Sequence, residues 1–306
     1  MDHSGFRKNN QKNFVISSKV PDVTKEKPCW LGIDEAGRGP VLGPMVYGTC
    51  YSPLEEKDHL KHLGLADSKT LTEEKRESIL GKMTTDSVDK IGWMVHILSP
   101  TFISNSMLKR TKYNLNALSH DSAIGLITKV LALGVNVTEI YVDTVGDATK
   151  YQQKLEKQFP GIDITVAKKA DSTYSIVSGA SIFAKVARDR ILKDWDFVEG
   201  IDVAAAECGS GYPNDPLTKK FLRHHMDKVF GFPQIVRFSW STASSILDKD
   251  AALVEWEDDD EADDKENPGA GSASLLTFFS SKADKGLKHK RHRFFTERNL
   301  YSVSQI

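Results

Sequence analysis

Leu31-Gly32-Ile33-Asp34-Glu35-Ala36-Gly37-Arg38-Gly39-Pro40 is the stretch of this sequence that decides the fold. It begins with apolar residues typical of a short strand and ends in a glycine turn. Neighbouring strand residues point to opposite faces of a sheet, so Asp34 and Glu35 can serve one site only if the strand ends at this point. The turn Gly37-Arg38-Gly39 predicts such an ending and adds backbone N–H groups and a guanidinium. This arrangement suits a metal ion with a phosphate or hydroxyl ligand, although acid pairs at strand ends also occur in solvated turns and helix caps.

Patterns of strands and helices continue on both sides of this stretch. Two strands are expected within 30–51, and further strands over 91–98, 139–143 and 162–168. Helices are expected in parts of 54–83 and over 110–133, 147–158 and 175–195. Strands that come first, followed by strands that alternate with helices, predict a mixed α/β sheet flanked by helices.

Composition divides the chain into three regions. Residues 1–27 are polar and predict a flexible N-terminal arm, and residues 28–250 predict the folded domain. Residues 251–306 form an acidic and then basic tail, which predicts partial disorder and contact with partners. The three cysteines are scattered, which argues against a disulfide framework and a thiolate zinc site, and no apolar run reaches the length needed to span a membrane.

Two later acids repeat the pattern of an acid at the end of an element. Asp143 closes an apolar strand run before a glycine, and Asp171 follows the next run, just before a long helix. Strand ends of α/β sheets are where sites collect, so these acids are expected to join Asp34 and Glu35. Four carboxylates together would repel one another unless divalent cations neutralise them, and carboxylate ligands favour Mg²⁺ or Mn²⁺ over Zn²⁺. Each acid taken alone is also compatible with a helix cap or a turn.

The motifs together resemble those of the type 2 ribonucleases H. The resemblance rests on 34–39 (Asp-Glu-Ala-Gly-Arg-Gly), 66–69 (Ala-Asp-Ser-Lys), 142–143 (Val-Asp), 169–171 (Lys-Ala-Asp) and 211–213 (Gly-Tyr-Pro), and covers roughly 29–245. Matches at 113–116 and 230–233 are similar to the catalytic subunits of the eukaryotic members. The resemblance implies a ribonuclease-H-like mixed sheet over 28–250, ending in a helical C-terminal extension.

The resemblance also implies an activity and a site. The expected reaction is metal-dependent endonucleolytic cleavage of the RNA strand of RNA–DNA hybrids, and cutting 5′ to single ribonucleotides embedded in DNA, as in ribonucleotide excision repair and primer removal. Asp34, Glu35, Asp143 and Asp171 match the catalytic acids that hold Mg²⁺ or Mn²⁺, with a two-metal mechanism expected. Gly37, Arg38 and Gly39 match the turn that senses the ribose 2′-hydroxyl, and Tyr212 matches a tyrosine that stacks on the following sugar.

Five further residues are candidates for phosphate contacts: Lys69, Lys112, Asn114, Lys185 and Arg188. Each of the lysines and the arginine is also compatible with a solvated surface charge. Lys185 and Arg188 lie three apart on one expected helix and are predicted to act together.

Other interpretations of the function stay open. One is a related carboxylate nuclease such as a 3′-exonuclease or an integrase-like strand transferase, and another is a hybrid-binding scaffold without activity.

The tail suggests partners. Residues 272–279 resemble a sliding-clamp-binding peptide but carry Ser272 where that motif has glutamine. The alternative is a small apolar segment that docks on this protein or on a partner. The resemblance implies a heterotrimer with accessory subunits B and C, for which Phe294, Phe295, Leu300 and Tyr301 are candidate anchors. The basic run 288–293 is compatible with nuclear import or with simple solvation, and the nucleus is the expected location.

Overall fold

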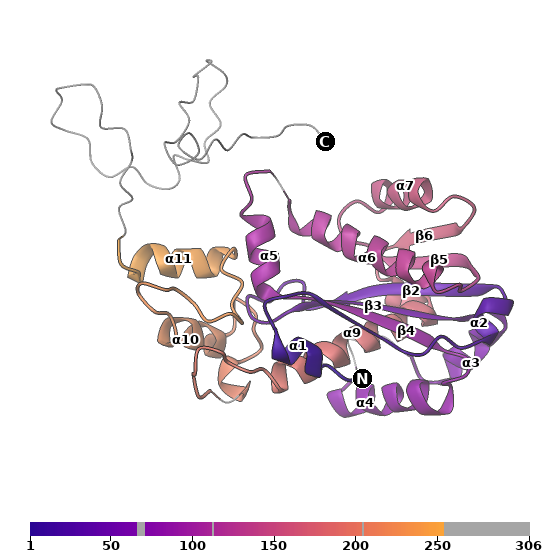
Figure 1. Cartoon of the computed structure of the whole chain (residues 1–306), viewed down its shortest axis with the longest axis horizontal. Helices are drawn as coiled ribbons and strands as arrows, with labels where there is room; N and C mark the ends of the chain where they lie inside the picture. The colour runs from indigo at the N-terminus through magenta and orange to yellow at the C-terminus, as the bar shows by residue number, and fades with distance from the viewer. Residues whose placement is uncertain (66–70, 112, 204, 254–306) are drawn as a thin grey trace, which may run out of the picture. The chain divides into compact units, whose positions relative to one another are not determined.

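A mixed six-stranded sheet forms the centre of the fold in the computed structural model, which describes residues 1–65, 71–111, 113–203 and 205–253 (Figure 1). The strands are β1 (Phe14–Ser17), β2 (Cys29–Ala36), β3 (Met45–Pro53), β4 (Gly92–Leu98), β5 (Val137–Asp143) and β6 (Asp163–Ala167). Their spatial order is β1-β4-β3-β2-β5-β6. The pairs β1/β4, β4/β3 and β3/β2 are antiparallel, whereas β2/β5 and β5/β6 are parallel, so the expected mixed α/β sheet is confirmed.

Helices cover both faces of this sheet. In chain order they are α1 (Ser4–Lys8), α2 (Val23–Glu26), α3 (Lys57–His62), α4 (Glu73–Gly81), α5 (Pro100–Met107), α6 (Leu115–Ala132), α7 (Ala148–Gln158), α8 (Ala170–Thr173), α9 (Ser175–Lys193), α10 (Pro216–His224) and α11 (Ser241–Asp250). Single turns occupy Leu54–Glu56, Lys82–Asp86 and Ala205–Cys208. In Figure 1, α6 and α7 lie over one face of the sheet, and α9 and α4 over the other. No helix among the described residues is long and apolar enough to span a membrane.

Side chains along β2 point alternately to the two faces of the sheet, and each face has its own hydrophobic core. Trp30 and Ala36 point into the cluster around α9, whereas Leu31 and Ile33 point into the cluster under α6 and α7. Helix α9 approaches the sheet so closely that a Cβ atom at Gly32 or Gly48 would collide with its backbone. This close approach is what the small residues of the expected helix over 175–195 permit.

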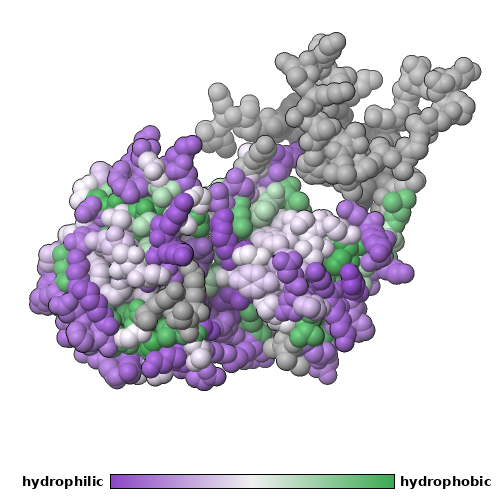
Figure 2. Space-filling model, turned by 180° about the vertical axis from the view of Figure 1, so that it is seen from behind, coloured by the Kyte–Doolittle hydropathy of each residue, from purple (hydrophilic) through white to green (hydrophobic). Residues whose placement is uncertain are grey.

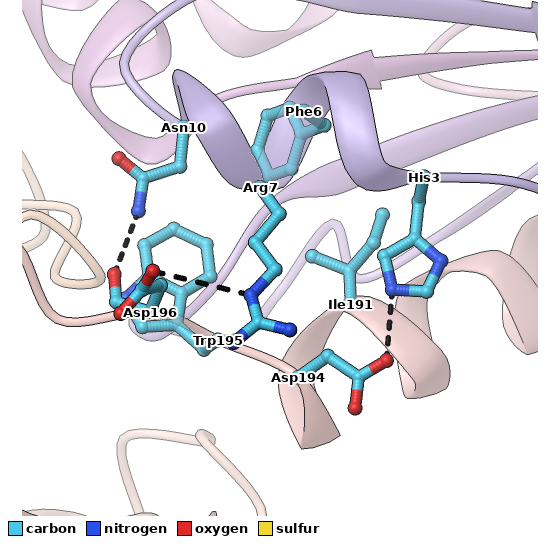
Figure 3. Close-up of a pocket in the computed structure, with 8 residues that line it drawn as sticks. All are labelled: His3, Phe6, Arg7, Asn10, Ile191, Asp194, Trp195 and Asp196. Carbon is cyan, nitrogen blue, oxygen red and sulfur yellow. Dashed lines mark hydrogen bonds and ion pairs between the residues drawn. The ribbon is translucent and has the colours of Figure 1, made fainter.

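The prediction of a flexible arm over residues 1–27 is wrong. Residues Phe14–Ser17 form the edge strand β1, which pairs with β4, and Met1–Ala252 form one compact unit. Figure 3 shows α1 seated on the chain just after α9, where the Phe6 and Trp195 rings meet edge to face at 6.1 Å. The His3 side chain pairs with Asp194 at 2.9 Å, and the Asn10 amide donates to the Asp196 carbonyl at 3.0 Å. Tertiary contacts, rather than local apolar periodicity, order this segment.

A third cluster lies beside the sheet, where α10 and α11 form the expected helical C-terminal extension. Its buried members are Val41, Leu42, Cys208, Phe221, Leu222, Ile235, Val236 and Ala243. Because Val41 and Leu42 come from the loop between β2 and β3, this extension packs directly behind the glycine turn. Residues 254–306, and with them the expectations for the tail, lie outside the described residues. The three cysteines are buried free thiols.

Candidate active site

Asp34 and Glu35 lie within β2 rather than after it. The strand continues to Ala36, with Asp34 opposite Gly48 and Glu35 opposite Tyr47 on β3. The expectation that the strand ends at the acid pair is therefore wrong, and the two side chains leave the sheet on opposite faces. Asp34 is buried (5% exposed) on the α9 side, where Ser181 hydrogen-bonds to its carboxylate. Glu35 is only partly buried.

Asp143 and Asp171 reach the same region from β5 and α8. Lys169 takes a left-handed conformation (φ +56°) that turns the chain from β6 into α8, and the backbone N–H of Ala170 donates to the Asp143 carboxylate at 2.9 Å. Asp171, in the first turn of α8, is 2% exposed. The Asp143 carboxylate at the end of β5 is thereby hydrogen-bonded to the first residue of α8, just after β6 ends.

The three aspartates influence one another electrostatically. The pKa of Asp34 is raised to about 7, mainly by burial and in part by the charges of Asp143 and Asp171. Hydrogen bonds from Ser181 and from the backbone N–H of Glu35, which is 2.7 Å from Asp34 Oδ1, oppose the rise in the pKa. Negative charge on Asp34 is therefore costly in this arrangement, as expected where carboxylates gather without a cation.

The carboxylate oxygens of Asp34, Asp143 and Asp171 are hard donors, which suit a divalent cation. Carboxylate oxygens are the ligands that Mg²⁺ and Mn²⁺ prefer, and a cation would relieve the repulsion felt by Asp34. Among the described residues, however, the side chains as they stand form no group of three or more His, Cys, Asp or Glu that could hold a metal ion. The acids have the right chemistry, but their present arrangement does not itself form a metal site.

The glycine turn after β2 is held from behind by one buried arginine, Arg237. Gly37 has φ +77°, which favours glycine. Arg237, fully buried, donates to the carbonyls of Gly37 (2.6 Å), Arg38 (3.0 Å) and Gly43 (2.8 Å). Burial, followed by the charge of Arg188, lowers the pKa of the Arg237 guanidinium.

Arg188 has a structural position rather than the predicted phosphate contact. The residue is 9% exposed, and its guanidinium donates to the carbonyls of Pro44 and Leu42, both at 3.3 Å. Lys185 lies one turn earlier on α9 and is partly exposed. The two residues do not form the exposed pair that was expected, because Arg188 turns inward to the loop between β2 and β3.

Tyr212 stands opposite the turn and is 51% exposed. A Cβ atom at Gly39 would lie 3.3 Å from the Tyr212 ring, a tight contact that would push the ring slightly away from the turn. An open cleft of about 470 Å³ lies here, lined by Glu35, Gly37, Arg38, Gly39, Lys185, Arg188 and Tyr212, among others. The structure therefore brings together the predicted turn, the tyrosine and one of the acids.

Of the other residues predicted to contact substrate, Asn114 and Arg38 hydrogen-bond within or to α6, and two lysines lie outside the described residues. The Asn114 side chain caps α6 by accepting from the backbone N–H of Ala117 at 3.0 Å, so it has a structural role in this state. Arg38 donates to Ser119 and Asn116 of α6, both at 2.5 Å, which ties the turn to that helix. Lys69 and Lys112 lie outside the described residues.

Sequence reasoning missed Arg237 and Trp240. The Trp240 indole N–H donates to the Gly39 carbonyl at 3.1 Å, and the Arg237 guanidinium lies 4.9 Å from the centre of the Trp240 ring. A lone arginine in a loop carries no periodic pattern. The one indication in the sequence was its place in the aromatic run Arg237-Phe238-Ser239-Trp240.

Comparison with known proteins agrees with this geometry. The family model described as Ribonuclease HII matches residues 31–243. The chain belongs to this family. It is 52% identical to the ribonuclease H2 A subunit of Mus musculus and 49% identical to that of Homo sapiens, in each case over the full length of both chains. It is 52% identical to the corresponding Arabidopsis thaliana protein, over 81% of each chain.

Solved structures of archaeal ribonucleases are similar as well. The ribonuclease H2 from Pyrococcus horikoshii is 32% identical with a TM-score of 0.59, covering 72% of this chain and 98% of that one. The ribonuclease HII in a complex with PCNA from Archaeoglobus fulgidus is 29% identical with a TM-score of 0.55, covering 71% of this chain and 96% of that one. This type 2 ribonuclease H is thus an endonuclease with the ribonuclease-H-like fold expected for the family.

Proposed function

We propose that this type 2 ribonuclease H cleaves the RNA strand of RNA–DNA hybrids and cuts 5′ to single ribonucleotides embedded in duplex DNA. The observation that carries the proposal is the shared cleft, where the turn 37–39 and the exposed Tyr212 ring face each other beside Glu35. A ribose 2′-hydroxyl distinguishes RNA from DNA, and glycines allow the backbone to approach it closely. The Tyr212 ring offers a flat apolar surface for the neighbouring sugar.

Asp34, Glu35, Asp143 and Asp171 are the residues that would hold Mg²⁺ or Mn²⁺. When bound, such ions lower the pKa of the attacking water and shield the charge of the phosphate, which is the chemistry of two-metal nucleases. Because the described acids do not form a ready metal site as they stand, binding would require their side chains to rearrange. Lys185, on the wall of the cleft, is suited to contact the phosphate.

The proposed reaction is hydrolysis of one phosphodiester bond. A water oxygen bonds to phosphorus, the bond from phosphorus to the 3′-oxygen of the preceding nucleotide breaks, and that oxygen takes up a proton. One product ends in a 3′-hydroxyl on the preceding nucleotide, and the other begins with a 5′-phosphate on the ribonucleotide. This cleavage would place the enzyme in ribonucleotide excision repair and primer removal, for which the nucleus is the proposed location.

A labelled DNA duplex with one internal ribonucleotide tests the proposal. We expect cutting 5′ to the ribonucleotide with Mg²⁺ or Mn²⁺, and no cutting with a chelator or with an all-DNA duplex. The assay should compare the chain alone with the chain plus candidate accessory subunits B and C. Binding without cutting in every mixture would favour the scaffold interpretation, and cutting only from free ends would favour an exonuclease.

Assembly with accessory subunits is proposed because similar eukaryotic relatives are named as the A subunit of ribonuclease H2. The surface seen in Figure 2 is mostly hydrophilic, with hydrophobic residues in small separate patches. Val229 (69% exposed) and Phe230 (90% exposed) stand on a tight turn in which the Asp227 carboxylate accepts from both their backbone N–H groups at 2.7 and 2.8 Å. A rigid turn that exposes two apolar side chains suits a protein partner.

Changing Val229 and Phe230 together to serine is expected to weaken assembly with the accessory subunits about 100-fold. The two side chains are exposed, so the melting temperature of the chain alone should stay within about 2 °C. Affinity measured by calorimetry checks this, with Val88→Ser (48% exposed) as the matched apolar control. Unchanged affinity would show that this turn is not part of the interface.

A sliding clamp is a further proposed partner through residues 272–279, which lie outside the described residues.

A further inference from the structure

The exposed side of α10, the helix that begins shortly after Tyr212, is basic. Three of its exposed side chains stand at positions i, i+3 and i+4, which places them next to one another on the helix: Lys220, Arg223 and His224. We call these three side chains the basic face of α10. With Pro216 they line an open hollow of about 330 Å³. The opposite side of the helix packs into the third hydrophobic cluster, so the basic face stands on a fixed support.

The acids on either side of α10 do not neutralise the basic face. The helix itself contains no acidic residue. The Asp215 carboxylate, at its N-terminus, accepts from the backbone N–H groups of Ser210 at 2.6 Å and of Leu217 at 2.8 Å. The Asp227 carboxylate, just after the helix, accepts from the backbone N–H groups of residues 229 and 230. Both carboxylates are therefore engaged in the turns that flank the helix.

The basic face forms no ion pair with any residue that the structure describes. Cations on the neighbouring long helix α9 behave differently, because Arg190 pairs with Glu77 and Lys193 pairs with Glu73, both on α4. Those charges hold two helices together, whereas the charges of the basic face hold nothing within the described chain. Clustered basic side chains on one side of a helix are typical of a surface that binds phosphate groups.

Helix α10 starts at the wall of the active-site cleft. The backbone N–H of Asp215, the residue before the helix, donates to the carbonyl of Tyr212 at 3.1 Å, and Tyr212 lines the cleft. A helix of nine residues is about 14 Å long, which is the length of about four base pairs of duplex. The net charge of the whole chain is −1, so binding of a polyanion requires a local concentration of positive charge such as this one.

We propose that the basic face of α10 binds the phosphate backbone of the duplex that flanks the ribonucleotide in the cleft. The inference rests on the proposed function and adds a second contact surface for the same substrate. Lysine and arginine contacts to phosphate carry no sequence information, but they fix the register of a duplex on a protein and make its affinity depend on salt. The basic face holds the flanking duplex, while the turn 37–39 and Tyr212 face the ribose in the cleft.

A double variant, Lys220→Gln with Arg223→Gln, removes two positive charges from the basic face. The matched control is Lys150→Gln with Lys157→Gln, two exposed lysines on α7, which Figure 1 shows well away from α10. We would measure the affinity of the full chain for the single-ribonucleotide duplex by fluorescence anisotropy between about 50 and 200 mM salt, within the assembled complex where activity requires it. Two further duplexes are shortened to about two base pairs on one side or the other of the ribonucleotide, too short to run along α10.

We expect the α10 variant to bind the full duplex about 10-fold more weakly than the wild type at the lowest salt and nearly as tightly at the highest, with a salt slope smaller by about 2. The difference should disappear with one of the shortened duplexes, because the wild-type protein then loses the same contacts. The α7 variant should keep the wild-type slope. Equal slopes for the α10 variant and the wild type would overturn the inference, as would a difference that persists with both shortened duplexes.

The same proteins distinguish nucleic acid from a protein partner. If the α10 variant bound the duplex normally but assembled more weakly with subunits B and C, the inference would be overturned and the basic face assigned to a protein interface. If the wild-type protein bound the duplexes with the expected difference in slope but cut none of them, the proposed function would fail, and the contact between α10 and phosphate would stand.

Discussion

Asp34→Asn is expected to lower the rate of cleavage about a thousandfold or more while leaving binding of the nucleic acid intact. Asp34 is the buried acid on which the charges of Asp143 and Asp171 act, so it is the residue best placed to share cations with both. Losing an ion that stabilises the transition state by several kcal/mol corresponds to a change of this size. Single-turnover cleavage of the single-ribonucleotide duplex, with binding followed by fluorescence anisotropy, measures both quantities.

The asparagine variant should remain folded. Its side-chain oxygen can still accept from the backbone N–H of Glu35, as Asp34 does at 2.7 Å, and the substitution removes a negative charge from a buried acidic cluster. The melting temperature without metal is therefore expected to be unchanged or higher. Asp163→Asn is the matched control, because Asp163 is exposed and begins β6 at the end of the sheet away from Asp143. Wild-type turnover by Asp34→Asn would contradict the assigned role.

Period-two patterns made much of the site predictable. Asp143 closes an apolar strand run, and its position at the carboxyl end of β5 follows directly from that run. The face taken by Glu35 was not predictable, because the glycine turn suggested that the strand had ended, whereas cross-strand pairing carries β2 on to Ala36 opposite Val46. Local sequence marks where a turn must come, but pairing with the neighbouring strand decides where the ladder stops.

Two features depend on contacts too distant in sequence to predict from local patterns. Strand β1 has only four residues and lies at the sheet edge, where pairing with β4 stabilises it. Arg237 is buried because it reaches the carbonyl of Gly37, which lies 200 residues earlier in the chain. Charge and composition alone place such an arginine at the surface, since a cation is rarely buried fully without partners.

Arg237→Met is expected to destabilise the protein by about 3–5 kcal/mol, which corresponds to a fall of roughly 10 °C in melting temperature. The substitution leaves the carbonyls of Gly37, Arg38 and Gly43 without the donor they share. Arg237→Lys should recover little of this loss, because a single ammonium cannot reproduce three directed hydrogen bonds or the packing on Trp240. Thermal unfolding of the metal-free chain measures the difference.

The same variant should also lose activity under conditions where it is fully folded. Arg237 donates to backbone carbonyls of residues 37–43 and lies over the Trp240 ring, so its loss acts on the site by letting the turn move. A displacement of about 1 Å at a positioning element lowers the rate about 100-fold. Arg190→Met is the control, because Arg190 forms a partly exposed pair with Glu77 away from the turn, and loss of such a pair costs about 1 kcal/mol or less. If Arg237→Met cleaved at the wild-type rate well below its melting temperature, the turn would be held by its own glycine geometry, and the arginine would be needed for stability alone.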